Sequence, residues 1–232
     1  MRRALAHLLI PVTIVLVAAV TVTVLDGVAG IRGVAPVQPP RAMGASAEPP
    51  PACRQYVPFQ ITPRPVDRPP ARPPRGRLTA VVRTNCGTLE ITLDARRFPR
   101  TVASFVHLAR HHVYDGTSIH RVVRGRLIQG GDPTGTGTGG AGYAVRERPP
   151  RGTAYPRGTV AMARPEGAPP GTSSSQFFIV TGDDAELPPV HAVIGHVTGG
   201  RDVLRRIDGL GDASGEPAQH VPILTVRVRE GR

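Results

Sequence analysis

Apolar and polar residues alternate in short segments through the second two thirds of the chain. The pattern is clearest at residues 89–93 and 224–228, where every second residue is apolar. Such alternation is typical of a half-buried antiparallel strand. On the same grounds and on their β-branched content, eight segments are predicted as strands: 78–84, 88–94, 118–123, 127–129, 159–163, 176–181, 192–197 and 223–229.

Two other segments have helical spacing. After Pro99, the residues Val102, Phe105 and Ala109 recur at intervals that place them on one helix face. A second, shorter helix is predicted over residues 202–207, ending at Gly209. Eight short strands with only two helices predict a mainly β domain over residues 78–232, built as a closed or nearly closed antiparallel barrel with helical caps.

The N-terminal residues 1–30 have a different pattern. Arg2 and Arg3 precede 22 residues, 4–25, that carry no charge. This length favours a transmembrane helix over the shorter apolar core of a signal peptide. With both arginines in the cytoplasm, the rest of the chain would lie outside the cell membrane. A cleaved signal peptide, which would give a secreted protein, and a buried core helix are the alternatives.

Residues 31–77 are predicted to be a linker. Thirteen of the 40 residues from 36 to 75 are proline. Proline lacks the backbone donor that helices and central strands need, so this segment should run as an extended, stiff spacer.

The charge of the chain is unevenly distributed. All 29 basic side chains are arginine, and the net charge is +12. Residues 1–77 hold 10 of these arginines and only 3 of the 17 acidic residues, so more than half of the excess charge precedes the predicted barrel. No nucleic-acid partner is therefore expected, because the barrel lacks aromatic-rich strands with interleaved basic residues. The 27 glycines and 26 prolines also exclude a coiled coil.

The chain contains two cysteines, Cys53 and Cys86. Outside the cytoplasm they could form a disulfide that ties the end of the linker to the tight turn after the first strand. Two free thiols are the alternative.

Three motifs follow one another in the barrel. They are His-Arg-Val-Val-x-Gly-x-x-Ile-Gln-Gly-Gly-Asp-Pro at residues 120–133, Gly-Thr-Val-Ala-Met-Ala at 158–163 and Ser-Gln-Phe-Phe-Ile at 175–179. In type and order these motifs resemble the cyclophilin-type peptidyl-prolyl cis-trans isomerases. The resemblance covers about residues 78–229. It implies an eight-stranded cyclophilin-like barrel with two capping helices, and an enzyme that accelerates rotation about X-Pro peptide bonds.

The resemblance also implies an active site. Arg121 would donate a hydrogen bond to the prolyl nitrogen, and Gln129 would hydrogen-bond Arg121 or the substrate carbonyl. Phe178 would form the floor of a proline pocket with His191 on its rim. The remaining substrate contacts implied are His120, Arg126, Leu127, Ala163, Arg164, Gln176 and Leu187. The reaction needs no metal or cofactor.

Three positions depart from the family pattern: Glu186 stands where many members have tryptophan, Arg164 where asparagine is common, and Arg126 is the most serious change. Arg126 stands where the family usually has phenylalanine in the wall of the proline pocket. A peptide-binding or scaffold module with weak or no activity is therefore the alternative to an isomerase that assists exported proteins to fold. Proline-containing polypeptides are the expected partners, and the protein is expected to be a monomer. The glycine-rich residues 135–140 are predicted to form a mobile loop beside the cleft, because no phosphate-loop lysine follows them.

Overall fold

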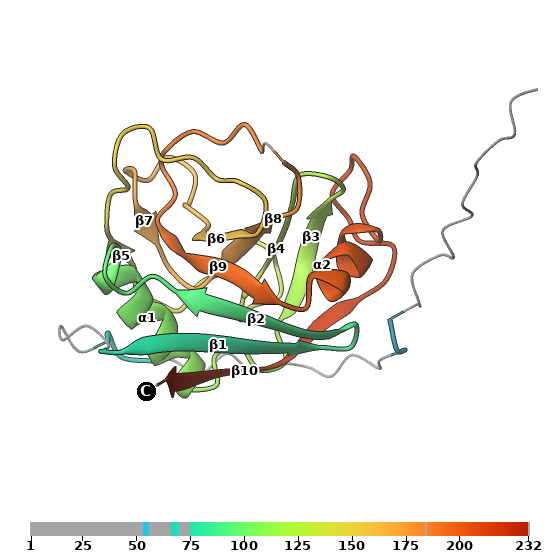
Figure 1. The fold of residues 1–232 in the computed structure, drawn as a ribbon, viewed down its shortest axis with the longest axis horizontal. Helices are drawn as coiled ribbons and strands as arrows, with labels where there is room; N and C mark the ends of the chain where they lie inside the picture. The colour runs from blue at the N-terminus through green and yellow to red at the C-terminus, as the bar shows by residue number, and fades with distance from the viewer. Residues whose placement is uncertain (1–52, 56–65, 70–74, 184, 232) are drawn as a thin grey trace, which may run out of the picture. The chain divides into compact units, whose positions relative to one another are not determined.

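The computed structural model describes residues 53–55, 66–69, 75–183 and 185–231 (Figure 1). The predicted membrane helix in residues 1–30 and most of the predicted linker lie outside these residues. Within the described ranges, no helix combines the length and the hydropathy needed to cross a bilayer.

The core of the domain is a closed antiparallel barrel of eight strands (Figure 1). Around the barrel the strands follow the order β1, β10, β3, β4, β8, β6, β9 and β2. Their bounds are β1 Arg77–Thr84, β2 Gly87–Leu93, β3 Ser118–Val123, β4 Leu127–Gly130, β6 Thr159–Met162, β8 Phe177–Val180, β9 Val193–Gly199 and β10 Val221–Gly231. The predicted barrel is therefore confirmed, and because it is closed it has no free strand edge.

The alternation in the sequence corresponds to the two faces of the strands. In β2, Leu89, Ile91 and Leu93 are buried, whereas Glu90 between them is exposed and Thr92 is half-buried. Every residue of β6 and of β8 is buried, because the outer face of these two strands is also covered.

Two helices accompany the barrel: α1 Pro99–Arg110 and α2 Arg201–Asp208. Proline suits the first turn of α1, where its missing N–H costs no helical hydrogen bond. Phe105 of α1 lies against the rings of Tyr114 and Phe177, with centroid distances of 5.1 and 5.9 Å. This aromatic cluster joins α1 to the barrel interior.

The structure also corrects the strand assignment. A separate two-stranded sheet pairs β5 Val145–Arg146 with β7 Thr172–Ser173. These strands were not predicted from the sequence, because two residues are too few to show an alternation of apolar and polar positions. β10 begins two residues before the predicted segment, since Val221 and Pro222 pair with β3, and it continues to Gly231, since it pairs with the whole of β1.

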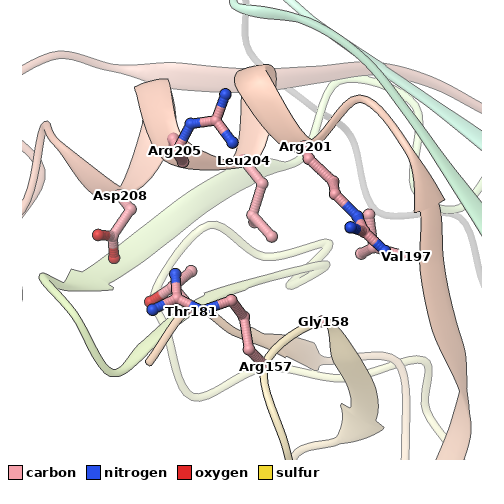
Figure 2. Close-up of a pocket in the computed structure, with 8 residues that line it drawn as sticks. All are labelled: Arg157, Gly158, Thr181, Val197, Arg201, Leu204, Arg205 and Asp208. Atoms are coloured by element: carbon pink, nitrogen blue, oxygen red, sulfur yellow. The ribbon is translucent and has the colours of Figure 1, made fainter. Parts of the chain in front are cut away.

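A pocket of about 290 Å³ lies between α2 and the adjacent ends of β6 and β8 (Figure 2). Leu204 of α2 points into it, and Asp208 faces Arg157 across it. None of the site residues predicted from the sequence lines this pocket.

The part of the linker that the structure describes is attached to the domain. Cys53 and Cys86 form a disulfide. Beside it, the Arg54 amide donates to the Asn85 carbonyl at 3.1 Å, and Asn85 Nδ2 donates back to the Arg54 carbonyl at 2.8 Å. The disulfide therefore lies within a short hydrogen-bonded contact between linker and hairpin.

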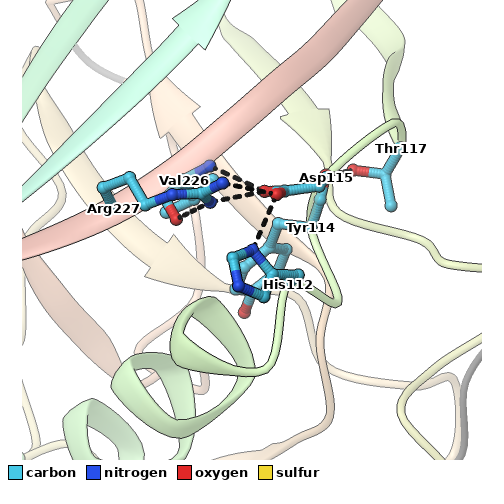
Figure 3. A network of polar contacts seen from close by, with 6 residues as sticks. All are labelled: His112, Tyr114, Asp115, Thr117, Val226 and Arg227. Carbon is cyan, nitrogen blue, oxygen red and sulfur yellow. Dashed lines mark hydrogen bonds and ion pairs between the residues drawn. The ribbon is translucent and has the colours of Figure 1, made fainter.

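A polar network connects the end of α1 to β10 (Figure 3). The carboxylate of Asp115 accepts hydrogen bonds from both terminal nitrogens of Arg227, at 2.9 and 2.8 Å, and from the Val226 amide at 3.1 Å. His112 Nδ1 lies 2.9 Å from the same carboxylate. Burial alone would raise the pKa of Asp115, but hydrogen bonds from Arg227, His112 and Val226 outweigh it and lower that pKa.

Candidate active site

Four residues on adjacent strands form a row across the barrel. The strand register places Arg121 of β3 opposite Gln129 of β4, Gln129 opposite Phe178 of β8, and Phe178 opposite Ala161 of β6. Adjacent strands lie about 4.8 Å apart, so the row spans about 15 Å. We call these four residues the site row. It brings three of the predicted catalytic residues side by side.

Arg121 is the exposed end of the site row. It lines an open hollow together with His120 and Gln129. Within the described part of the chain, the Arg121 guanidinium makes no hydrogen bond or ion pair, so its N–H groups are available to a bound molecule.

Gln129 is held by a second glutamine. Its Nε2 donates to Oε1 of Gln176 at 2.9 Å, and Gln176 Nε2 donates to the carbonyls of Gly137 and Gly139 at 3.0 and 2.8 Å. The Gln129 amide nitrogen therefore bonds Gln176, which leaves the Gln129 carbonyl oxygen for Arg121, one of its two predicted partners. Since its donor is occupied, the Gln129 carbonyl oxygen is fixed in orientation.

The glycine-rich segment is organised by Asp132. One carboxylate oxygen of Asp132 accepts from the amide and the hydroxyl of Thr134, both at 2.8 Å, and the other accepts from the Gly139 amide at 3.0 Å. Burial would raise the pKa of Asp132, but these hydrogen bonds outweigh it and lower that pKa. The carboxylate thus closes the loop whose carbonyls Gln176 binds.

His120 lies beneath this loop. Its ring lies 3.6 Å from the position that a Cβ on Gly137 would occupy, which is ordinary van der Waals distance, so the ring packs close to the loop. Burial lowers the pKa of His120, and Asp132 and the adjacent Ser118 backbone only partly oppose this effect. The imidazole is therefore neutral at pH 7.

Toward the other end of the site row, Phe178 belongs to an aromatic cluster with His191 and Tyr155. The rings of Phe178 and His191 meet edge to face, with centroids 5.1 Å apart and an interplanar angle of 88°. Tyr155 lies 6.4 Å from Phe178, and its hydroxyl donates to the His191 carbonyl at 2.9 Å. Tyr155 was not predicted from the sequence, because nothing around it distinguishes it from a loop tyrosine.

The orientation of His191 is fixed by its own contacts. Its Nδ1 lies 3.2 Å from the Met162 carbonyl, which makes Nδ1 the protonated nitrogen. Burial lowers the pKa of His191, and nearby Arg164 adds to the effect. The ring is thus neutral at pH 7 where it packs against Phe178.

Leu127 and Leu187 complete the apolar side of this region. Leu127 is buried on β4, and Leu187 packs against the core. Arg126 is exposed, and its Nε donates to the Ala185 carbonyl at 3.2 Å. The Arg126 guanidinium is therefore held at the Ala185 carbonyl. The backbone carbonyl of Arg126 accepts a hydrogen bond from the Thr181 amide at 3.0 Å.

Ala163 and Arg164 follow β6 at the end of the site row. The Ala163 amide donates to the Gln176 carbonyl at 2.9 Å. The guanidinium of Arg164 bonds the Ala168 carbonyl. The Arg164 side chain is therefore turned into its own loop. Among the residues that the structure describes, no group of three or more histidine, cysteine or acidic side chains could hold a metal ion.

The site therefore combines an available arginine, a fixed amide chain and an aromatic cluster on adjacent strands of the barrel. These features define a closed β-barrel protein with a candidate binding site. The family model described as cyclophilin type peptidyl-prolyl cis-trans isomerase/CLD matches residues 79–228. The chain belongs to this family and is a peptidyl-prolyl cis-trans isomerase.

Individual relatives agree with this assignment. Peptidyl-prolyl cis-trans isomerase B of Streptomyces anulatus is 40% identical over 150 residues, which are 56% of this chain and 83% of the relative. Peptidyl-prolyl cis-trans isomerase A of Mycobacterium tuberculosis is 39% identical over 140 residues, 53% of this chain and 75% of the relative.

Solved structures agree as well. A cyclophilin type isomerase of Cryptosporidium parvum has a TM-score of 0.62 at 28% identity, and the match covers 67% of this chain and 99% of that protein. The same protein in the presence of the dipeptide Ala-Pro has a TM-score of 0.60 at 28% identity, covering 66% and 99%.

Proposed function

We propose that the site row catalyses rotation about the X-Pro bond, with Arg121 as the group that stabilises the transition state. The peptide bond resists rotation by about 18–20 kcal/mol because the nitrogen lone pair is delocalised. In the twisted state that lone pair is localised on the prolyl nitrogen and can accept a hydrogen bond. A guanidinium N–H aimed at it stabilises the twisted state more than the planar one, and only such differential stabilisation accelerates the step.

The proline ring would bind against the aromatic cluster. Phe178 would form the floor of this proline site, His191 its rim, and Leu127 and Leu187 its apolar sides. This proposal is supported by the neutral, fixed imidazole of His191, since a charged ring beside a pyrrolidine would require desolvation. The related C. parvum protein was solved in the presence of Ala-Pro, a dipeptide that contains the X-Pro bond of the proposed substrate.

The remaining residues would hold the peptide on both sides of the bond. The backbone of Ala163 and Arg164 would bind the residue before proline, while the fixed carbonyl oxygen of Gln129 would orient Arg121 or accept from the substrate. Gln176 would act as a positioning residue, because it holds Gln129 on one side and the Gly137 and Gly139 carbonyls on the other. His120 supports that loop from below.

The single observation that carries this mechanism is that the Arg121 side chain, exposed beside Gln129, has no partner within the described residues. We expect Arg121→Ala to lower kcat/KM on a short X-Pro peptide about 100-fold, the usual cost of losing one donor to a transition state. KM should change much less. Arg121→Lys should restore little, since it keeps the charge but loses the planar fork.

The matched control is Arg83→Ala, which removes an exposed arginine from β1, a strand that does not contribute to the site row. Prolyl isomerisation followed by NMR exchange measures both variants. If Arg121→Ala lowered kcat/KM only through KM, Arg121 would be a binding residue and the mechanism would be wrong.

We further propose that the enzyme is exported, is anchored by residues 1–30 and assists exported proteins to fold as a monomer. Arg2 and Arg3 before an uncharged run of 22 residues support the anchor. The Cys53–Cys86 disulfide supports an oxidising compartment. Protease treatment of intact cells, with mass analysis of the membrane fraction, tests this: a protease-resistant domain or a mass lacking the first 30 residues would contradict it.

A further inference from the structure

The segment 212–216 forms a wall beside Arg121. The Val122 amide donates to the Gly215 carbonyl at 2.8 Å, and Val123 forms a parallel bridge with Asp212. A Cβ on Gly215 would lie 3.4 Å from Cγ and 3.5 Å from Nε of Arg121. The wall therefore lies close beside the side chain of the proposed catalytic arginine, around the same hollow.

The backbone of this wall is held by its own side chains. Oδ1 of Asp212 accepts from the amide and the hydroxyl of Ser214, at 2.8 and 2.6 Å. The Ser214 hydroxyl in turn accepts from the Glu216 amide at 3.2 Å. Asp212 is therefore engaged within the segment, and its hydrogen bonds to Ser214 lower its pKa.

Glu216 is different. Its side chain is exposed, and within the described residues its carboxylate has no hydrogen-bond or ion-pair partner. Glu216 lines the same open hollow as Arg121 and Gln129, and of the described residues that line this hollow it is the only acidic one. A protein with a net charge of +12 thus presents one available carboxylate beside its catalytic arginine.

The site row indicates which part of a substrate would reach Glu216. If the residue before proline lies at Ala163 and the ring lies on Phe178, the chain continues over β4 toward β3. That path covers two strand spacings, about 10 Å, and an extended chain advances about 3.3 Å per residue. The second or third residue after proline therefore lies over Arg121 and the wall.

We propose that Glu216 is a specificity-determining residue that makes the enzyme prefer a basic side chain at the second or third position after proline. This inference rests on the proposed function, because it uses the same peptide path. The one positively charged side chain among the described residues that line this hollow is Arg121, which in the proposed mechanism donates to the prolyl nitrogen. His120, which also lines the hollow, is neutral at pH 7. A lysine of the substrate is then the natural partner of the carboxylate.

The test compares substrates on the full-length protein. The peptides are Ala-Ala-Pro-Ala-X-amide and Ala-Ala-Pro-Ala-Ala-X-amide, which place X at the second or the third position after proline, with X as lysine, glutamine or glutamate. The exchange rates are measured by NMR at low ionic strength. We expect kcat/KM for the lysine peptide to exceed that for the glutamate peptide about three- to tenfold, the range of an exposed ion pair gained and a like-charge contact removed. The ratio of the lysine to the glutamate value should fall toward one in about 0.5 M salt, because salt screens the interaction between the carboxylate and the lysine.

Three variants decide the origin of the preference. Glu216→Gln should reduce the lysine-to-glutamate ratio below about twofold, and Glu216→Lys should invert it. Glu90→Gln, an exposed glutamate on β2 away from the hollow, should leave the ratio unchanged. Because each ratio comes from one preparation, the fraction of folded enzyme cancels.

The outcomes separate the two proposals. If the wild-type enzyme does not accelerate the glutamine peptide, the proposed function itself fails. If it accelerates that peptide but shows no preference for lysine, or keeps the preference after Glu216→Lys, the assignment of Glu216 is overturned while the isomerase mechanism stands.

Discussion

Removing the carboxylate of Asp115 tests how strongly the end of α1 is fastened to β10 (Figure 3). Asp115→Ala deletes the acceptor for the Val226 amide and for both terminal nitrogens of Arg227. Val226 is fully buried, so its N–H loses a partner that water cannot readily replace.

The magnitude follows from the burial of each partner. An orphaned buried N–H costs about 1–3 kcal/mol. The ion pair with Arg227 adds at most about 1 kcal/mol, because the Arg227 side chain is 46% exposed and screened by solvent. We therefore expect Asp115→Ala to lower the free energy of unfolding by about 1–4 kcal/mol, which for a domain of this size lowers Tm by about 2–16 °C.

The effect should depend on pH in a defined direction. The pKa of Asp115 is lower in the folded protein than its ordinary value, so its ionisation contributes stability above the unfolded pKa. That contribution is lost as the pH falls through the folded pKa. The Tm difference between wild type and Asp115→Asn, followed by circular dichroism, should therefore be constant from pH 5 to 8 and narrow below about pH 4.

A surface ion pair provides the matched control. Glu230→Gln breaks the contact between Arg110 and Glu230, whose side chains are 56% and 62% exposed. Its cost should stay below about 1 kcal/mol. If Asp115→Ala cost no more than Glu230→Gln, the buried Val226 amide would not need the carboxylate, and the reasoning would be refuted.

Three further predictions concern the linker, the histidines and the pocket wall. Cys53→Ser should lower the free energy of unfolding by about 3–4 kcal/mol, the value of the chain-entropy model for a separation of 33 residues. In a thermal melt, reduction of the wild type should lower Tm by as much as this substitution does, and reduction of Cys53→Ser should leave its Tm unchanged. Because the pKa values of His120 and His191 are lowered, kcat/KM should be constant from pH 7 to 9 and decline only below about pH 6.5. A decline centred above pH 7 would contradict the inference that both rings are neutral at pH 7. Arg126→Phe should lower KM for an X-Pro peptide about two- to fivefold by extending the apolar pocket, and an unchanged KM would mean that position 126 does not contact the ring.

The barrel was predictable because its strands carry a strong local signal. Residues 89–93 alternate, and the structure buries alternate side chains there. The ends of β10 and the short β5–β7 sheet were not predictable, since their length is set by the partner strand rather than by their own pattern. The Asn85–Cys86 turn was predicted correctly as a hairpin, because its partner strands are adjacent in the sequence.

The site was predictable only where a motif marked it. Arg121, Gln129 and Phe178 came from the resemblance to a family, and the register places them side by side. The bond from Gln129 to Gln176 and the ring contact of Tyr155 depend on residues 47 and 23 positions away, so no local pattern indicates them. For the same reason, Glu216 has no signal in the sequence.

The pairing of β1 with β10 has a consequence for engineering this enzyme. Arg77 pairs with Gly231, so the first and last strands of the domain end beside each other, and neither contributes a residue to the site row. A short peptide could therefore join these two ends, and new termini could be opened in an exposed loop such as 148–154. The domain should accordingly tolerate circular permutation, or insertion into a loop of a host protein, with its catalytic face intact.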